Sequence, residues 1–346
     1  MSNHPDTAPA LLCWVVTDGA AGRVSQALGL AEALAKLTSL TIVRKDIKVR
    51  TPWRAMPAWT WGDAPGRLSA EGARFTPPWP DIAIGCGRLT VPLCLWLKKT
   101  QGAFALQLQS PRWREEAFDM IIAPAHDDNP GANVFSVIGS VNRLDPVQMA
   151  ADGEKLAGAL PLAGALAGAP RLAALIGGDS KAFRMTRDAI SRIAADLERA
   201  AEAGAQIAVT FSRRTGAAAE AAFRRALSHP RIWIWDGRPV ATPGGEALAN
   251  PYPGLLAWAD HVMVTADSAN MLSEAATAGR PIHIAALPGG SPKFTRLHAS
   301  LIDRGAARPF DGTLEPRTYM PLAETARAAE AAARRIAVWR GAEEGT

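Results

Sequence analysis

One acidic residue in a strand–turn–helix segment offers the most specific chemistry in the chain. Within residues 259–281, a short apolar run ends in a polar turn, and a helical stretch follows. Asp267 or Ser268 can cap this helix, and Glu274 lies less than two turns further in. A carboxylate there can accept hydrogen bonds from both hydroxyls of a ribose. A surface ion pair is the default role of an isolated helical acid, so both interpretations stay open here.

Three more polar turns follow apolar runs and contain groups that bind anions. Residues 17–26 combine glycines with hydrogen-bond donors, although an ordinary strand-to-helix turn explains the glycines about as well. Residues 177–181 place two glycines, a hydroxyl and a lysine before a helix, without Walker A spacing. Residues 210–215 contain adjacent arginines, which match diphosphate oxygens or merely decorate a solvated loop. The candidate ligand-binding residues in these turns are Gly22, Arg23, Gln26, Ser180, Ser212, Arg213, Arg214 and Thr215.

His126 is a candidate general base, because it follows an apolar run and its side chain titrates near neutral pH. Asp127 beside it and Asp18 in the first polar turn complete the candidate catalytic set. A plain polar turn explains His126 about as well. Adjacent residues cannot all face one metal ion, and the three cysteines show no CxxC spacing. We therefore expect no metal site, no disulfide and no cofactor.

The composition is that of a globular protein with a mild positive charge. Of 346 residues, 48% are hydrophobic and 21% are charged, and the net charge is +5. That charge suits an anionic ligand or membrane surface, and no segment resembles a nucleic-acid-binding module. We expect no nucleic-acid partner. The sequence shows no secretory signal, which favours a cytoplasmic protein.

Apolar runs of strand length alternate with helical stretches, which predicts parallel sheets covered by helices on both faces. The series restarts after an Ala/Gly/Pro-rich stretch. We therefore predict an α/β fold of two Rossmann-like, doubly wound domains that face each other across a cleft. The expected strands are 11–17, 41–49, 81–85, 103–109, 120–123 and 134–138, then 171–176, 206–210, 231–235, 261–265 and 281–285. The expected helices include 26–37, 89–99, 183–203 and 322–338.

The expected domain division follows from that restart. Residues 1–155 form an acceptor-side domain, 156–170 a linker, and 171–320 a nucleotide-sugar-binding domain. The helix within 321–346 could pack back on the first domain. His283 lies inside an expected strand, so we interpret it as a core residue.

A stretch from Lys45 to Trp79 combines tryptophans with basic residues and many Pro and Gly. Such a mixture can dock on an anionic lipid surface, which would make the protein peripheral on a membrane. An ordered loop that buries its tryptophans against the sheet is the slightly favoured alternative. The residues concerned are Trp53, Trp59, Trp61, Trp79, Lys45, Lys48, Arg50, Arg54, Arg67 and Arg74.

The segment around Glu274 resembles the nucleotide-sugar half of two-domain GT-B glycosyltransferases, which carry Ala-Asp, a strand, a Ser/Thr-rich turn, Ser-Glu and Ala-Gly-x-Pro. The likeness is greatest to enzymes that add N-acetylglucosamine to lipid-linked peptidoglycan precursors. It implies that Glu274 holds the ribose and that the loop matching Ser268, Asn270 and Met271 meets the phosphates. Two departures stand out. Ser268 replaces a glycine, and the first polar turn has Arg23 and Val24 where that family commonly has a histidine.

Nearly the whole chain resembles the family named after the plant mitochondrial-fission factor "elongated mitochondria". The plant member is associated with recruiting a dynamin-related GTPase, so this resemblance implies a scaffold. The segments that carry it are Gln26-Ala-Leu-Gly-Leu-Ala-Glu32, Gly85-Cys-Gly-Arg88, Gln109-Ser-Pro-Arg112, Ala123-Pro-Ala-His-Asp-Asp128, Ser212-Arg-Arg-Thr215, Asn250-Pro-Tyr252 and Thr265-Ala-Asp-Ser268.

Together these features predict a GT-B-like protein that binds a UDP-sugar and transfers it to a lipid or glycan acceptor. Direct displacement needs no metal ion if Arg213, Arg214, Lys293 and helix N-termini neutralise the leaving diphosphate. Arg88 and Arg112 are second-tier ligand-binding candidates, because each follows an expected strand. The alternatives are a non-catalytic scaffold and, more weakly, a nucleotide-sugar epimerase.

Overall fold

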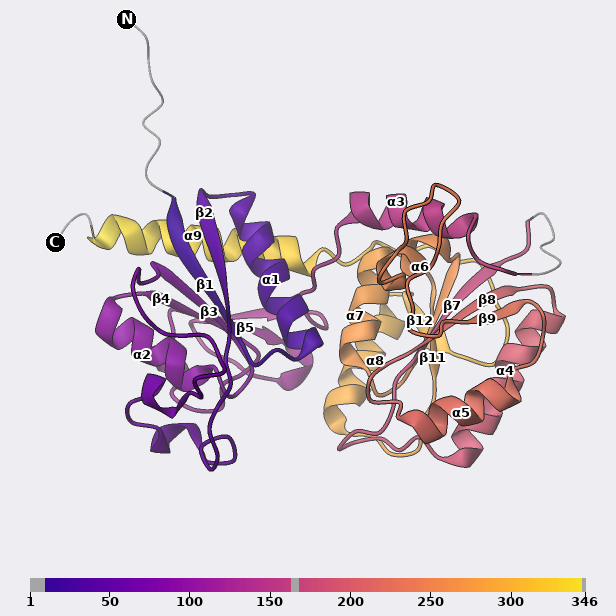
Figure 1. Cartoon of the computed structure of the whole chain (residues 1–346), viewed down its shortest axis with the longest axis horizontal. Coiled ribbons are helices and arrows are strands. Elements are labelled where there is room, and N and C mark those ends of the chain that lie inside the picture. The colour runs from indigo at the N-terminus through magenta and orange to yellow at the C-terminus, as the bar shows by residue number, and fades with distance from the viewer. Residues whose placement is uncertain (1–9, 163–167, 344–346) are drawn as a thin grey trace, which may run out of the picture. The chain divides into compact units, whose positions relative to one another are not determined.

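The computed structural model describes residues 10–162 and 168–343, which form two compact α/β units (Figure 1). Unit 1 comprises Met1–Arg143 and Ala323–Thr346, and unit 2 comprises Leu144–Leu322. The chain therefore passes between the units twice. Each unit contains one sheet of six parallel strands.

The sheet of unit 1 has the strand order β2-β1-β3-β4-β5-β6. Because β1 lies between β2 and β3, the strand order reverses there, and the loops after β1 and β3 diverge to opposite faces of the sheet. Such a switch point is where open α/β sheets bind ligands. The strands are β1 Leu11–Thr17, β2 Leu40–Asp46, β3 Ile82–Cys86, β4 Phe104–Leu108, β5 Met120–Pro124 and β6 Val134–Val137.

Alternate strand residues of unit 1 enter two separate cores. On one face, Val15 packs in a cluster with residues of α1 (Ala21–Ala35) and α9 (Glu324–Glu343). Helix α9, yellow in Figure 1, contacts α1, β5 and β6. The carboxylate of Glu324, at its start, accepts a hydrogen bond of 2.9 Å from the backbone N–H of Ile138. The last helix is therefore part of unit 1.

The opposite face of unit 1 is covered by α2 (Val91–Gln101) and by an irregular segment, residues 47–81. This fully described segment contains short 3₁₀ turns and no α-helix. Aromatic side chains take the place of a helix: Trp61 is buried, and Trp14 of β1 packs edge-on against Phe75. Burial of these large rings supplies the apolar contact that a crossover helix would otherwise make.

The sheet of unit 2 has the order β12-β11-β10-β7-β8-β9, so its switch point lies at β7, between β8 and β10. Its strands are β7 Arg171–Ile176, β8 Gln206–Phe211, β9 Ile232–Ile234, β10 His261–Thr265, β11 Ile282–Ala285 and β12 Ala307–Pro309. Its helices are α3 Pro146–Ala157, α4 Arg187–Glu202, α5 Ala217–Ala226, α6 Tyr252–Trp258, α7 Ala269–Ala278 and α8 Pro292–Asp303.

Helix α3 belongs to unit 2 because it packs closely on α6. A Cβ on Gly153 would lie 3.0 Å from the Cβ of Ala257, and a Cβ on Gly254 would lie 2.9 Å from the backbone of Asp152. Each helix therefore has a glycine at the point where the other helix approaches closely. The first segment of unit 1 accordingly ends at residue 143, before the boundary expected at 155, and α3 takes up the start of the expected linker. Residues 163–167 of that linker lie outside the described residues.

The structure contains two elements that the sequence did not predict, α3 and β12, and several predicted elements end elsewhere, such as β2, which ends at Asp46 instead of residue 49. Helix α1 begins at Ala21 instead of residue 26, so Gly22, Arg23 and Gln26 lie in its first turns and not in a loop. The first residues of this helix, Ala-Gly-Arg, are only weakly apolar, so the hydrophobic periodicity did not predict its first turn. Helix α4 begins at Arg187, later than expected, because the preceding residues form a turn around Ser180.

Candidate functional site

The switch point of unit 2 joins the loops that follow β7, β8 and β10. Its centre is Asp267, whose side chain is wholly buried. The carboxylate accepts hydrogen bonds from the backbone N–H of Gly178 at 3.1 Å and from the Thr265 hydroxyl at 2.7 Å. The Arg214 guanidinium lies 2.7 Å from the same carboxylate. Asp267 thus links the loops after β7, β8 and β10, and we call this arrangement the Asp267 clamp.

The two glycines after β7 are required by this clamp. A Cβ on Gly177 would overlap the Asp267 carboxylate, and a Cβ on Gly178 would overlap the backbone carbonyl of Arg214. Close loop packing therefore explains the glycine pair without a bound phosphate. The Ser180 hydroxyl accepts hydrogen bonds from the backbone N–H groups of Ala182 and Phe183, so it shapes its own turn.

The loop after β8 presents its two arginines differently. Thr215 is buried and its hydroxyl donates to the carbonyl of Gly177 at 2.5 Å, while the Ser212 hydroxyl accepts from the backbone N–H of Arg214 at 3.1 Å. Both arginines are exposed, but Arg214 is paired with Asp267, whereas Arg213 forms no ion pair among the described residues. Arg213 is therefore the arginine of this loop that a diphosphate can reach most easily.

Helix α7 starts directly after the clamp. The Ser268 hydroxyl accepts a hydrogen bond of 3.4 Å from the backbone N–H of Met271, which confirms Ser268 as the N-cap. Asn270 and Met271 lie half-buried in the first turn. The N–H groups of such a turn favour anions. Lys293, near the start of α8, is half-buried.

Glu274 forms no surface ion pair. The Tyr252 hydroxyl donates to Oε2 of Glu274 at 2.5 Å, and burial raises the pKa of Glu274 to about 7, although the Tyr252 hydrogen bond acts in the opposite direction. Tyr252 begins α6, and sequence reasoning assigned it no role. Its Asn-Pro-Tyr segment appeared only as a mark of family resemblance, so the signal was present without a chemical interpretation.

The switch point of unit 1 joins the start of α1 to the loops after β1, β3 and β4. The carboxylate of Asp18 binds the Arg23 guanidinium through two hydrogen bonds of 2.7 and 2.6 Å. Burial raises the pKa of Asp18, but the hydrogen bond and charge of Arg23, together with backbone hydrogen bonds, outweigh it and lower the pKa overall. Gln26 is buried, and its Oε1 accepts from Nε2 of Gln109 at 3.2 Å. Gly22 precedes Arg23 on the same turn of α1.

The other four candidates of unit 1 follow β3, β4 and β5. Arg88 donates to the backbone carbonyls of Met56 and Arg54, at 2.9 and 2.5 Å, and so anchors the segment 47–81. Arg112 is exposed after β4. His126 is buried at the end of β5, and Asp127 is half-buried. Because β5 is three strands from β1, His126 lies on the order of 14 Å from the Asp18 loop.

The tryptophan-rich stretch mostly packs against the sheet of unit 1. Trp61 is buried, Trp79 contacts Trp14 and Trp96, and Arg67 lies 4.0 Å above the Trp53 ring. Trp59 differs, with 65% exposure. These contacts support the packing alternative for all but Trp59, and membrane docking stays a prediction.

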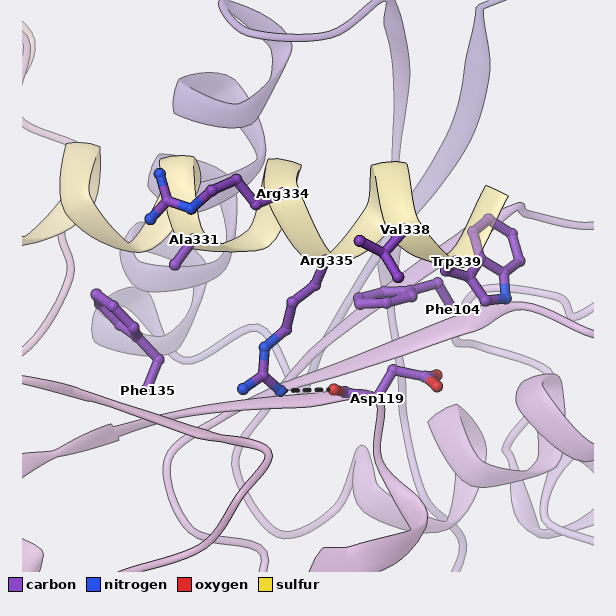
Figure 2. A pocket seen from close by; sticks show the side chains of 8 residues that line it. All are labelled: Phe104, Asp119, Phe135, Ala331, Arg334, Arg335, Val338 and Trp339. Atoms are coloured by element: carbon purple, nitrogen blue, oxygen red, sulfur yellow. Dashed lines mark hydrogen bonds between the residues drawn. The ribbon is translucent and has the colours of Figure 1, made fainter. Parts of the chain in front are cut away.

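A groove of about 550 Å³ lies on unit 1 beside α9 (Figure 2). Figure 2 shows Phe104 and Trp339 on one side of it and Phe135 on the other, with Arg335 between them donating to the carbonyl of Asp119 at 3.0 Å. Phe104 and Asp119 lie at the amino ends of β4 and β5. The groove is therefore at the opposite sheet edge from the switch point.

The described residues contain neither a cluster of metal-ligating side chains nor a membrane-spanning helix. No three His, Cys, Asp or Glu residues within 10–162 and 168–343 are grouped as metal ligands would be. In the same residues, no helix combines the length and the apolar character needed to cross a bilayer.

Solved structures of UDP-sugar enzymes have a similar fold. The UDP-GlcNAc 2-epimerase of Methanocaldococcus jannaschii is 10% identical, with a TM-score of 0.56 over 95% of this chain and 100% of that chain. MnaA of S. aureus, solved with UDP, is 10% identical, with a TM-score of 0.51 over 95% of this chain and 88% of that chain. At this identity the likeness concerns the fold alone. It confirms an α/β fold of two Rossmann-like units of the GT-B type.

Two relatives are similar in sequence. The mitochondrial fission protein ELM1 of Arabidopsis thaliana is 26% identical over 304 residues, which cover 80% of this chain and 68% of that protein. The protein RP120 of Rickettsia prowazekii is 27% identical over 353 residues, which cover 92% and 96%. The family model described as mitochondrial fission ELM1 matches residues 21–336. The chain therefore belongs to the mitochondrial fission ELM1 family.

Proposed function

We propose that unit 2 binds a UDP-sugar at its switch point and that the protein transfers the sugar to a lipid or glycan acceptor without a metal ion. The placement of Glu274 carries this proposal. Its carboxyl group lies on α7, the helix that follows the Asp267 clamp, and it is bound by a tyrosine hydroxyl instead of a cation. A carboxyl group so placed suits the two hydroxyls of a ribose.

The diphosphate would meet the first turn of α7 and the loop after β8. Ser268, Asn270 and Met271 supply this helix start, whose N–H groups favour negative charge. Arg213 adds an exposed guanidinium group. With Lys293 these groups would neutralise the diphosphate as it leaves, which replaces the usual role of a metal ion.

The acceptor would meet unit 1. His126 or Asp127 would take the proton of the acceptor hydroxyl, because an imidazole or carboxylate can act as general base. Asp18, Arg23 and Gln26 would then orient the acceptor. The lowered pKa of Asp18, which Arg23 already binds, makes it a weak base, so we assign the proton transfer to His126 or Asp127.

A non-catalytic scaffold is the second candidate function. One observation favours it: the buried Asp267 and the partly buried Asp18 each pair with an arginine of the same unit, so both switch points are internally neutralised without a ligand. Membership of a family that includes a plant mitochondrial fission protein points the same way. The fold likeness to UDP-GlcNAc 2-epimerases supports an epimerase as a third, weaker candidate.

Calorimetry with a panel of nucleoside diphosphates tests the binding proposal. We expect UDP to bind more tightly than ADP or GDP, and Glu274→Ala to weaken UDP binding by at least about 1 kcal/mol, since hydrogen bonds to a charged group are lost. Glu220→Ala, which removes the half-buried acid that pairs with Arg224 on α5, is the matched control and should bind UDP as the wild type does. Equal affinity of wild type and Glu274→Ala would remove Glu274 from the site.

A further inference from the structure

We propose that Tyr252 is a positioning residue that holds the Glu274 carboxyl group in place for the ribose and thereby sets the pH at which the protein binds a uridine nucleotide. The proposal rests on the proposed function, because it concerns the same carboxyl group. Its starting point is the hydrogen bond of 2.5 Å from the Tyr252 hydroxyl to Oε2 of Glu274.

The hydrogen bond from Tyr252 leaves one oxygen of the Glu274 carboxyl group available to a ligand. Among the described residues, Oε1 of Glu274 accepts no hydrogen bond, whereas Oε2 is occupied by Tyr252. A carboxylate oxygen has two lone pairs, so Oε1 can accept from both ribose hydroxyls. Tyr252 therefore selects which oxygen faces the ligand.

The tyrosine is itself held rigidly. It is the first residue of α6, and the glycine contacts between α6 and α3 fix that helix two residues further along, at Gly254. Burial raises the pKa of the Tyr252 hydroxyl well above its ordinary value, and the charge of Glu274 adds to the shift. The hydroxyl therefore stays protonated, as a constant donor to Glu274.

Glu274 titrates in surroundings of low charge. It is the only ionisable residue of α7, and Tyr252 is the only one of α6. Only burial, which raises the pKa of Glu274 to about 7, and the Tyr252 hydroxyl, which lowers it, act on this group. The charged and titratable groups on the neighbouring elements, none of which contributes to the pKa shift of Glu274, are Asp152, Asp260, His261, Asp267 with Arg214, Arg280, His283, Lys293, Arg296, His298 and Tyr319.

The direction of the pH effect follows from the hydrogen bonds. The ionised carboxylate accepts from ribose hydroxyls at Oε1, while a protonated carboxyl group offers poorer acceptors, so affinity should rise as the pH passes through 7. Removing the Tyr252 hydroxyl takes away a donor that stabilises the ionised form. Tyr252→Phe should therefore raise the pKa of Glu274 further and move the binding transition to higher pH.

UDP-N-acetylglucosamine is the best probe, since its diphosphate diester does not titrate between about pH 5.5 and 8.5. In calorimetry we expect wild-type affinity to rise about tenfold across that range, with a midpoint near pH 7. Tyr252→Phe should shift the midpoint upward, and Glu274→Gln should abolish it. Tyr319→Phe is the matched control, because the Tyr319 hydroxyl also bonds α7, at the carbonyls of Ala275 and Ala276, but not Glu274.

A second measurement separates this inference from the proposed function. Carbon-13 NMR of labelled glutamate follows the Glu274 carboxyl group without ligand, and we expect Tyr252→Phe to raise its titration midpoint while Tyr319→Phe does not. An unmoved midpoint in Tyr252→Phe, in either experiment, overturns the inference even if the nucleotide binds. Absence of binding with a shifted NMR midpoint would instead refute the proposed function and leave the Tyr252–Glu274 coupling intact, without its role in recognition.

Discussion

The two switch points use the same pair of residue types in different ways. In unit 2, Asp267 is fully buried and its arginine partner comes from the loop after a different strand, so the ion pair ties separate loops together. In unit 1, Asp18 pairs with Arg23, five residues later in the chain, and both side chains are partly exposed. The Asp267–Arg214 pair therefore joins two loops that are distant in sequence, whereas the Asp18–Arg23 pair joins residues that are close in sequence.

This difference separates a preformed site from an adaptable one. Binding costs less when the groups that meet a ligand are already fixed. The Asp267 clamp fixes the loops around α7 before any ligand arrives, whereas the Asp18–Arg23 pair is partly exposed and joins residues only five positions apart. We infer that unit 2 supplies tight nucleotide recognition and that unit 1 adapts to an acceptor.

The largest expected effect separates turnover from binding. His126→Ala in unit 1 should reduce sugar transfer by about 10²–10⁴-fold, because a positioned general base is lost, while UDP affinity stays unchanged. Asp128→Asn, at the exposed neighbour, is the control. Mass spectrometry of a UDP-sugar incubated with protein and membrane extract measures the transfer. If the wild type consumes no donor from a broad panel, the scaffold function replaces the transferase.

The clamps should also differ in their effect on stability. Asp267→Ala leaves Arg214 and buried donors unpaired and should lower the free energy of unfolding of unit 2 by about 3 kcal/mol. Asp18→Ala breaks a partly exposed pair and should cost unit 1 at most about 1 kcal/mol. Hydrogen exchange, evaluated separately for the amides of each unit, measures both. An equal loss of unfolding free energy in Asp267→Ala and Asp18→Ala would contradict the proposed difference between the two ion pairs.

Acid should weaken unit 2 through its buried histidines. Nδ1 of His261 and Nε2 of His283 lie 3.2 Å apart, and burial lowers the pKa of His283 to about 3. The unfolded chain takes up the proton first, so this contribution to stability is present above about pH 6.5 and falls by about 1.4 kcal/mol per pH unit below it. Glu274 also makes the stability of unit 2 depend on pH, but it does so equally in wild type and in His283→Gln. The difference in unfolding free energy between the two proteins therefore reports the histidine contribution alone. A difference that is independent of pH would contradict it.

The smallest effect distinguishes the adjacent arginines. Arg213→Ala should weaken UDP about tenfold and leave uridine unaffected, because the lost hydrogen bonds concern only the diphosphate. Arg214→Ala should instead destabilise unit 2 as Asp267→Ala does. Calorimetry with both ligands on each variant measures this. Equal weakening of UDP and uridine by Arg213→Ala would move Arg213 away from the diphosphate.

Much of the fold was predictable because its signals are local. Strands 171–176 and 261–265 match β7 and β10 residue for residue, since buried parallel strands are continuous apolar runs. The Ser268 cap is equally local. Helix α3 was missed although Asp145 and Pro146 form a good helix start, because its place is decided by glycine contacts with α6, a hundred residues away.

The site was less predictable, because its partners are tertiary. Glycines 177 and 178 resemble a phosphate cradle, yet the neighbouring Asp267 and Arg214 require them. Arg88 looked like a ligand-binding residue, and its guanidinium group anchors the backbone near Met56. The role of Tyr252 depends on a contact across 22 residues, which no spacing rule reveals.

Ribose recognition by Glu274 is the central claim, and ligand and residue can be changed together to test it. Calorimetry would compare UDP with 2′,3′-dideoxy-UDP on the wild type and on Glu274→Ala at a pH well above 7. We predict that the wild type prefers UDP by at least about tenfold and that Glu274→Ala binds both ligands equally, since the lost partner is shared. If Glu274→Ala keeps the wild-type preference for UDP, the ribose hydroxyls bind elsewhere and the account of this site is wrong.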